Sequence, residues 1–109
     1  MRVILGEKGS GKTTKLIEIA AKFGAYIVVR DYRKADEVFK IAKDMGYSIP
    51  YPISFFDFIH KKFNGCGISA FVIDDVDSLL QYVAGCVPVL AFSVTTGEEG
   101  NENRVIRSF

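Results

Sequence analysis

Short apolar runs alternate with amphipathic segments along most of the chain. Nearly continuous apolar runs are typical of strands that are buried on both faces of a sheet. They occupy residues 3–5, 25–29, 70–73 and 89–94. Between them, apolar residues recur every three or four positions, which predicts helices. These helical segments lie at residues 14–23, 35–42, 54–63 and 76–83, and each is followed by a glycine: Gly24, Gly46, Gly65 or Gly85.

This alternation predicts βαβ crossovers and therefore an α/β fold of three layers, with helices on both faces of a mainly parallel sheet. Residues 47–52 contain two prolines and can supply only a short edge strand. A polar turn over residues 96–103 precedes a last short strand over residues 104–109. Because that turn is too short for a crossover helix, we expect a hairpin with an antiparallel C-terminal edge strand. The length of 109 residues predicts one domain over residues 1–109.

The composition, with 49% hydrophobic and 13% aromatic residues, is that of an ordinary globular core, so we do not expect disorder. A net charge of +1 excludes a general electrostatic attraction to nucleic acid or membranes, so any basic surface must be local. The uncharged stretch over residues 79–96 is long enough to raise the question of a membrane span. It contains Gln81, Gly85 and Pro88, and we interpret it as a helix end, a turn and a strand. Because the first strand begins at the N-terminus with no signal peptide before it, we expect a cytoplasmic protein that does not bind membranes.

A glycine-rich turn stands between the first predicted strand and the first predicted helix. Residues 6–13, Gly-Glu-Lys-Gly-Ser-Gly-Lys-Thr, match the Walker A pattern of Gly, four residues, Gly, Lys and Ser/Thr without a mismatch. Backbone N–H groups of such a turn point into one concavity, and the helix dipole adds positive charge there, so the turn can bind phosphate. Glycines at positions Gly6, Gly9 and Gly11 allow positive φ angles and a close approach of the backbone to the phosphates.

Two side chains of this turn have predicted roles in nucleotide binding. The Lys12 ammonium reaches the β- and γ-phosphates, and the Thr13 hydroxyl is a Mg²⁺ ligand. The alternative is a glycine-rich turn that has a lysine nearby by chance. The predicted nucleotide-binding residues are Gly6, Glu7, Lys8, Gly9, Ser10, Gly11, Lys12, Thr13 and Thr14.

Two carboxylates follow the apolar run over residues 71–73, where Asp74 and Asp75 leave the predicted strand. Ligands bind at the carboxyl ends of strands in open α/β sheets, and carboxylate oxygens suit Mg²⁺. An apolar strand that ends in acids has the form of a Walker B strand, with Asp74 as the predicted metal-binding residue opposite Thr13. The alternative is that Asp74 only caps the helix that follows.

Three segments in this order, residues 6–13, 71–75 and 89–95, resemble those of P-loop NTPases of the additional-strand (ASCE) division, which includes AAA+, RecA-like and helicase ATPases. In that division a strand ending in a polar residue lies between the Walker A and Walker B strands, and residues 88–95 resemble it. More loosely, residues 53–58 resemble a helicase segment in which a hydrophobic helix follows a strand that ends in Ser or Thr. We expect the chain to depart from helicases by lacking their second lobe, and from AAA+ proteins by lacking their helical lid. It resembles the minimal stand-alone domains that phages and mobile elements encode.

The resemblance implies a catalytic set of Lys12, Asp75, Ser93 and Thr95. Asp75 stands where many of these ATPases carry a glutamate that orients or deprotonates the attacking water, and aspartate is shorter by one methylene. Ser93 and Thr95 share one face of the predicted strand, from which they would contact the γ-phosphate or the water. Two hydroxyls that satisfy backbone groups at a strand end are the alternative.

Three functions fit these features. The first is an ATP-binding, Mg²⁺-dependent NTPase that hydrolyses ATP beside nucleic acid, with candidate nucleic-acid contacts at Arg30, Tyr32, Arg33 and Lys34. The alternative for those residues is an ordinary charged helix start. The second function is a nucleoside or nucleotide kinase, and the third is a nucleotide-binding interaction module with little turnover. A domain without a lid often completes its site with another copy of itself or with a larger partner.

Overall fold

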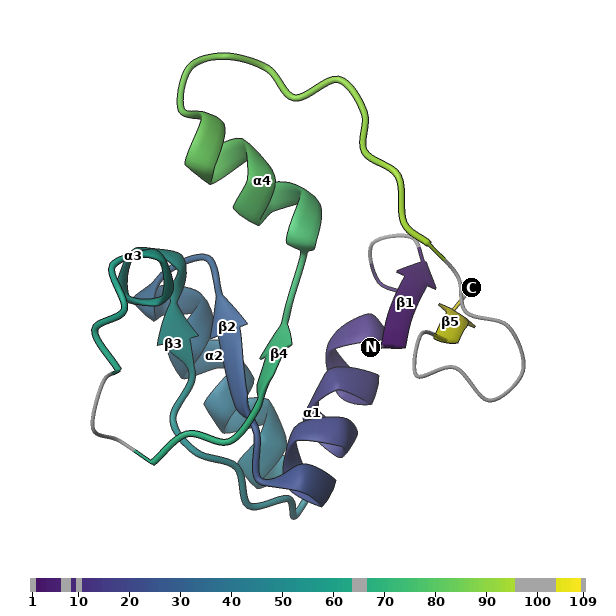
Figure 1. Cartoon of the computed structure of the whole chain (residues 1–109). Coiled ribbons are helices and arrows are strands. Elements are labelled where there is room, and N and C mark those ends of the chain that lie inside the picture. The colour runs from purple at the N-terminus through teal and green to yellow at the C-terminus, as the bar shows by residue number, and fades with distance from the viewer. Residues whose placement is uncertain (1, 7–8, 10, 64–66, 96–103, 109) are drawn as a thin grey trace. The chain divides into compact units, whose positions relative to one another are not determined.

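The computed structural model describes residues 2–6, 9, 11–63, 67–95 and 104–108, and the chain forms two compact units (Figure 1). We call Met1–Lys12 together with Val89–Phe109 the terminal unit, and Thr13–Pro88 the central unit. The predictions for Glu7, Lys8 and Ser10, and the turn predicted over residues 96–103, lie outside the described residues.

The terminal unit contains a pair of parallel strands. β1 (Arg2–Gly6) pairs with β5 (Arg104–Ser108), with Arg2 opposite Arg104 and Gly6 opposite Ser108. The expected antiparallel edge strand in a C-terminal hairpin is therefore wrong. The reason is that β5 pairs with the first strand of the chain and not with the segment before it. A pattern of apolar residues identifies a strand but does not specify its neighbour or its direction.

The strand predicted over residues 89–94 is also wrong, because residues 88–95 form neither helix nor strand. Leu90, Phe92 and Val94 are exposed, and Leu90 reaches 92%. A strand requires a hydrogen-bonded neighbour, and neither sheet of the described residues includes this segment. Its apolar residues give it the pattern of a buried strand, but that pattern contains no information about a partner.

The central unit is built on a parallel sheet of strand order β3-β2-β4. β2 (Tyr26–Val29) lies in the middle, between β3 (Ile53–Ser54) and β4 (Phe71–Ile73). Helices alternate with these strands along the chain. This arrangement confirms the predicted α/β fold with a parallel sheet.

The helices are α1 (Lys12–Phe23), α2 (Tyr32–Asp44), α3 (Phe55–Ile59) and α4 (Val76–Ala84). The edge strand expected within residues 47–52 forms instead at β3, directly after the two prolines, because proline has no N–H to donate to a sheet. α3 ends before the predicted position 63, because the chain turns after Ile59 and Lys61 adopts a φ of 53°. Within the described ranges, none of the helices combines the length and the apolar character needed to cross a lipid bilayer.

Two apolar clusters pack on opposite faces of the central sheet. Successive strand residues point to opposite faces, so Ile27 and Val29 belong to one cluster and Val28 to the other. The first cluster includes residues from α1 and α2: Ile17, Ala20, Ala35, Val38 and Ala42. In the second, Val28 packs with Phe55 of α3 and Leu79 of α4. Helices therefore pack on both faces, as the alternation of elements predicted.

The predicted apolar faces of α3 and α4 are only partly buried. Val76 and Val83 are 44% and 65% exposed, although their spacing on α4 predicted burial. Phe56 of α3 is 45% exposed, whereas its neighbour Phe55 is buried. Each helix thus contacts the sheet along a stripe narrower than its apolar face, and periodicity alone does not reveal that width.

Candidate functional site

The glycine-rich turn connects β1 to α1 as predicted. β1 ends at Gly6 and α1 begins at Lys12. Positive φ is confirmed at Gly9 (83°) and Gly11 (89°), whereas Gly6 is the last strand residue. The Lys12 Nζ donates a hydrogen bond of 2.7 Å to the Gly6 carbonyl oxygen. The lysine amino group is therefore folded back over the start of the turn.

Replacing Gly9 by alanine is expected to lower the free energy of unfolding by about 1–2 kcal/mol, because a Cβ disfavours left-handed backbone. Apart from its chain neighbours, no heavy atom of the described residues lies within 4 Å of the position that this Cβ takes, so the cost is conformational and not steric. Asparagine tolerates left-handed backbone better, so Gly9→Asn should cost less. Chemical denaturation measures both variants, and equal losses would contradict the positive φ of Gly9.

The carboxyl edge of the central sheet holds a hydroxyl and a carboxylate. Ser54 ends β3 opposite Val29, and Asp74 follows β4. The Asp74 backbone N–H donates to the Val28 carbonyl oxygen over 2.9 Å, so the β2–β4 ladder continues to this residue. Ser54 and Asp74 are only 3% and 5% exposed. Both polar side chains are thus fixed at the edge where ligands of parallel sheets bind.

Asp75 has a left-handed backbone, with φ 55° and ψ 67°. It occupies the N-cap position of α4, which the capping alternative had given to Asp74, but its side chain makes no capping hydrogen bond. Left-handed backbone costs about 1–2 kcal/mol for most residues, although aspartate tolerates it better than most. Such strain without a local hydrogen bond is frequent at functional sites. The exposed Asp75 carboxylate is a candidate for chemistry at the same sheet edge.

The predicted metal ligands, Asp74 at this edge and Thr13 in α1, are of the kinds that Mg²⁺ uses in nucleotide sites. The described residues contain no group of three or more His, Cys, Asp or Glu side chains that could hold a metal ion. Mg²⁺ in nucleotide sites is usually bound by one or two carboxylates, water and substrate phosphates. Asp74 and the half-buried Thr13, in the first turn of α1, offer a carboxylate and a hydroxyl from the central unit.

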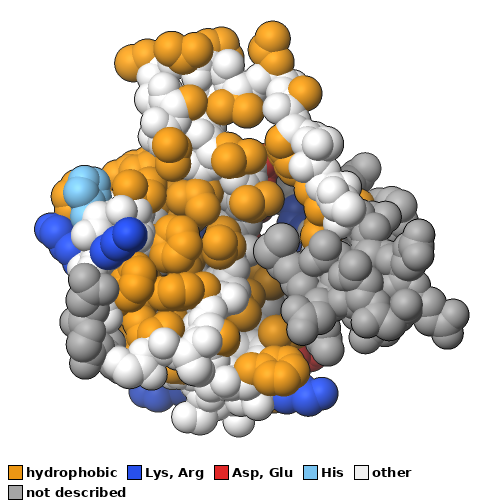
Figure 2. Space-filling model, viewed as in Figure 1, with side chains coloured by type: hydrophobic (Ala, Val, Ile, Leu, Met, Phe, Trp, Pro, Cys, Tyr) orange, Lys and Arg blue, Asp and Glu red, His pale blue; other side chains and the backbone are white. Residues whose placement is uncertain are grey.

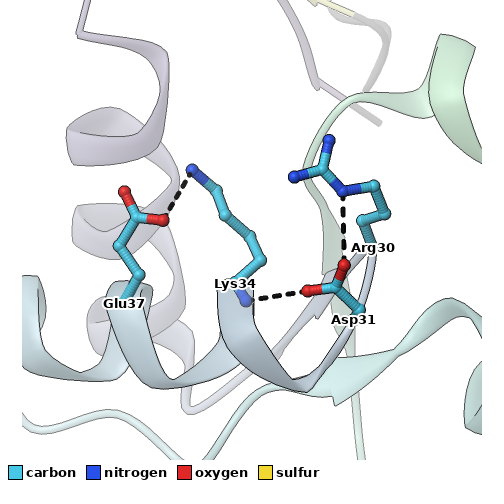
Figure 3. Close-up of polar contacts among 4 residues, drawn as sticks. All are labelled: Arg30, Asp31, Lys34 and Glu37. Atoms are coloured by element: carbon cyan, nitrogen blue, oxygen red, sulfur yellow. Dashed lines mark hydrogen bonds and ion pairs between the residues drawn. The ribbon is translucent and has the colours of Figure 1, made fainter.

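The polar residues after β2 form a local network (Figure 3). Asp31 caps α2 by accepting a hydrogen bond of 2.9 Å from the Lys34 backbone N–H, and Arg30 Nε lies 3.5 Å from the Asp31 carboxylate. That backbone hydrogen bond, assisted by the charge of Arg30, lowers the pKa of Asp31. The Lys34 Nζ lies 3.6 Å from Glu37 Oε2. Two of the cations predicted to contact nucleic acid are therefore paired with carboxylates.

Tyr32, another predicted nucleic-acid contact, joins the starts of α2 and α3. Its hydroxyl donates a hydrogen bond of 2.6 Å to Asp57 Oδ2, while the Asp57 backbone N–H donates to Ser54 Oγ over 3.2 Å. The Tyr32–Asp57 bond was not predicted from the sequence. No local pattern signals it, because its partners are separated by 25 positions.

Tyr32 and Tyr51 are expected to ionise above the ordinary tyrosine pKa of 10.0, because each donates to a carboxylate, Asp57 and Asp36 respectively. A raised pKa in the folded state means that these bonds stabilise the fold fully below the unfolded pKa and lose their effect as pH rises through the folded pKa. Titration of tyrosinate absorbance measures this. In the Asp57→Asn variant, the pKa of Tyr32 should return to its ordinary range. A titration curve identical to that of the parent chain would contradict the Tyr32–Asp57 bond.

Ser93 and Thr95 lie in the terminal unit, in the exposed segment without regular structure. They do not share the face of a strand as predicted, because no strand forms there. The structure thus brings Ser54, Asp74 and Asp75 to the carboxyl edge of the central sheet, and the catalytic roles of Ser93 and Thr95 stay predictions.

The candidate site residues fall into three groups: the glycine-rich turn, the carboxylates after β4 and the polar network after β2. Comparisons with protein-family models, curated proteins and solved structures found no match for this chain.

Proposed function

We propose that the chain binds ATP with Mg²⁺ and hydrolyses it, working beside nucleic acid. The observation that carries this proposal is the uninterrupted Walker A pattern over residues 6–13, between β1 and α1, with Gly9 and Gly11 at positive φ. Such a turn presents backbone N–H groups at a helix N-terminus, where phosphate groups bind.

Lys12 has the central role in binding. Its ammonium donates to the neutral Gly6 carbonyl at 2.7 Å, an acceptor weaker than an anionic phosphate oxygen. When ATP binds, Lys12 exchanges this carbonyl for the β- and γ-phosphates, where it offsets the negative charge that builds up during transfer.

Thr13 and Asp74 are the residues that would hold Mg²⁺, and the ion would supply charge neutralisation for the phosphoryl transfer. Water attacks the γ-phosphorus, the bond to the β-phosphate oxygen breaks and ADP leaves. Asp75 accepts the proton of the attacking water, because its carboxylate is exposed and is not engaged in capping α4. The Ser93 and Thr95 hydroxyls are proposed to contact the γ-phosphate or the water.

Release of inorganic phosphate from ATP, GTP, CTP and UTP tests this function, with and without Mg²⁺ and with and without single-stranded DNA. The proposal predicts phosphate release from ATP that stops when Mg²⁺ is removed and increases with DNA. Tight ATP binding without phosphate release would overturn hydrolysis in favour of an interaction module. Transfer of the phosphoryl group to an added nucleoside would instead identify a kinase.

A further inference from the structure

An exposed aromatic ring in the first turn of α3 lies beside an imidazole and a lysine that follow the helix. Phe56 is 45% exposed, and its ring centroid lies 4.1 Å from that of His60. His60 Nδ1 lies 2.8 Å from the Phe56 carbonyl oxygen, which fixes the imidazole beside the ring. The Lys62 Nζ lies 4.6 Å from the centroid of the Phe56 ring. Bases of single-stranded nucleic acids stack on aromatic rings of this kind, and nearby cations strengthen the contact.

The start of α2 adds further cations next to α3, because the Tyr32–Asp57 hydrogen bond of 2.6 Å holds the two helix starts together. Arg30 and Arg33 flank Tyr32 in the sequence, and both are exposed. We call the exposed residues of this region the α2–α3 surface: Arg30, Arg33, Phe56, His60, Lys61 and Lys62. All of them belong to the central unit.

The acidic side chains of this region are already engaged. Asp31 accepts a hydrogen bond from the Lys34 backbone, and Asp57 accepts one from Tyr32. Among the described residues, Arg33, Lys61 and Lys62 take part in no ion pair. Figure 2 shows basic side chains beside the single histidine, next to a broad area of hydrophobic side chains. A chain with a net charge of only +1 thus has a group of exposed basic residues on the α2–α3 surface, and Lys62 of that group lies over the Phe56 ring.

We propose that the α2–α3 surface binds single-stranded nucleic acid. Arg33, Lys61 and Lys62 contact the phosphates, and the exposed side of the Phe56–His60 pair stacks with a base. A single strand fits better than a duplex, because the faces of duplex bases are stacked on one another and cannot meet Phe56. This inference rests on the proposed function in that it names the partner beside which ATP hydrolysis takes place.

Fluorescence anisotropy of labelled oligothymidylate tests the inference with the full chain in the absence of nucleotide. We expect the single strand to bind more tightly than a duplex of equal length by about tenfold or more, since base stacking is the difference. Oligouridylate in a parallel titration distinguishes RNA from DNA as the preferred strand. Equal affinity for single strand and duplex, or no binding at low salt, would overturn the proposal.

Variants of the aromatic ring separate stacking from general attraction. Phe56→Ala should weaken binding of the single strand about tenfold, and Phe56→Trp should retain it. Phe23→Ala is the matched control, because Phe23 is 52% exposed and has Lys22 Nζ at 5.4 Å from its ring, but lies on α1. If both alanine variants bind alike, Phe56 does not stack with a base.

Salt dependence tests the phosphate contacts independently of the ring. Arg33→Ala should reduce the slope of log affinity against log salt by about 0.7–1. An unchanged slope in both Arg33→Ala and Lys62→Gln would contradict the phosphate contacts.

ATP binding is measured separately on the same chain. If the parent chain binds ATP but not the oligonucleotide, this inference alone is rejected. If it binds the oligonucleotide but not ATP, the proposed ATPase alone is rejected.

Discussion

ATP is expected to bind the Lys12→Ala variant about 10- to 100-fold more weakly than the parent chain, because a hydrogen bond to a charged group contributes about 1.5–3 kcal/mol. The turn already holds the Lys12 Nζ 2.7 Å from the Gly6 carbonyl oxygen, so little side-chain ordering remains to be done when phosphate replaces that carbonyl. The loss should be much smaller for AMP, which has no β- or γ-phosphate. Isothermal titration calorimetry measures these affinities.

Lys15→Ala is the matched control for this experiment. Lys15 lies three positions after Lys12 on the same helix and is also half-buried, but it is outside the Walker A pattern. The control should bind ATP like the parent chain. Equal affinity of Lys12→Ala and the parent would reject the phosphate-binding role of Lys12, and an equal loss in both variants would attribute the effect to α1 and not to the turn.

Asp75→Asn is expected to hydrolyse ATP about 10²–10⁴-fold more slowly, the contribution typical of a general base, with little change in ATP affinity. The hydrolysis rate and the ATP affinity respond differently because a proton acceptor acts only in the chemical step, whereas Lys12 also acts in binding. Asp77→Asn is the control, since Asp77 is an exposed aspartate in the first turn of the same helix. Wild-type turnover in Asp75→Asn would exclude Asp75 as the base.

The backbone of Asp75 allows a second test that does not depend on activity. Asp75→Gly should be more stable than Asp75→Ala by about 1 kcal/mol, because both variants lack the carboxylate and only alanine keeps a Cβ in left-handed backbone. The φ of 55° at Asp75 is the basis of this difference. If thermal denaturation shows no advantage for glycine, the strain assigned to this position is absent.

The local features of the fold were predictable from the sequence because short-range rules determine them. Helical spacing placed Ala35, Val38 and Ala42 in the core, and each is at most 1% exposed. The Walker A spacing located a turn in which Gly9 and Gly11 have positive φ. In both cases the sequence signal and its structural cause lie within a few residues of each other.

Features that depend on distant partners were not predictable. The direction of β5 follows from its pairing with β1 at the other end of the chain. Residues 89–94 have a strand-like pattern, but no strand of the described residues pairs with them. The Tyr32–Asp57 bond joins two helix starts, and its partners are separated by 25 positions that include α2 and β3. Apolar periodicity and motif spacing are local patterns, so they do not predict any of these contacts.

The central claim is that residues 6–13 bind the phosphates of a nucleotide. The most direct test is calorimetric titration of the parent chain with ATP, ADP and AMP, each with and without Mg²⁺. The proposal predicts that ATP and ADP bind more tightly than AMP, that Mg²⁺ strengthens ATP binding, and that Thr13→Ala removes most of that Mg²⁺ effect. Equal affinity for the three nucleotides, or no binding of any of them, would contradict a phosphate-binding turn.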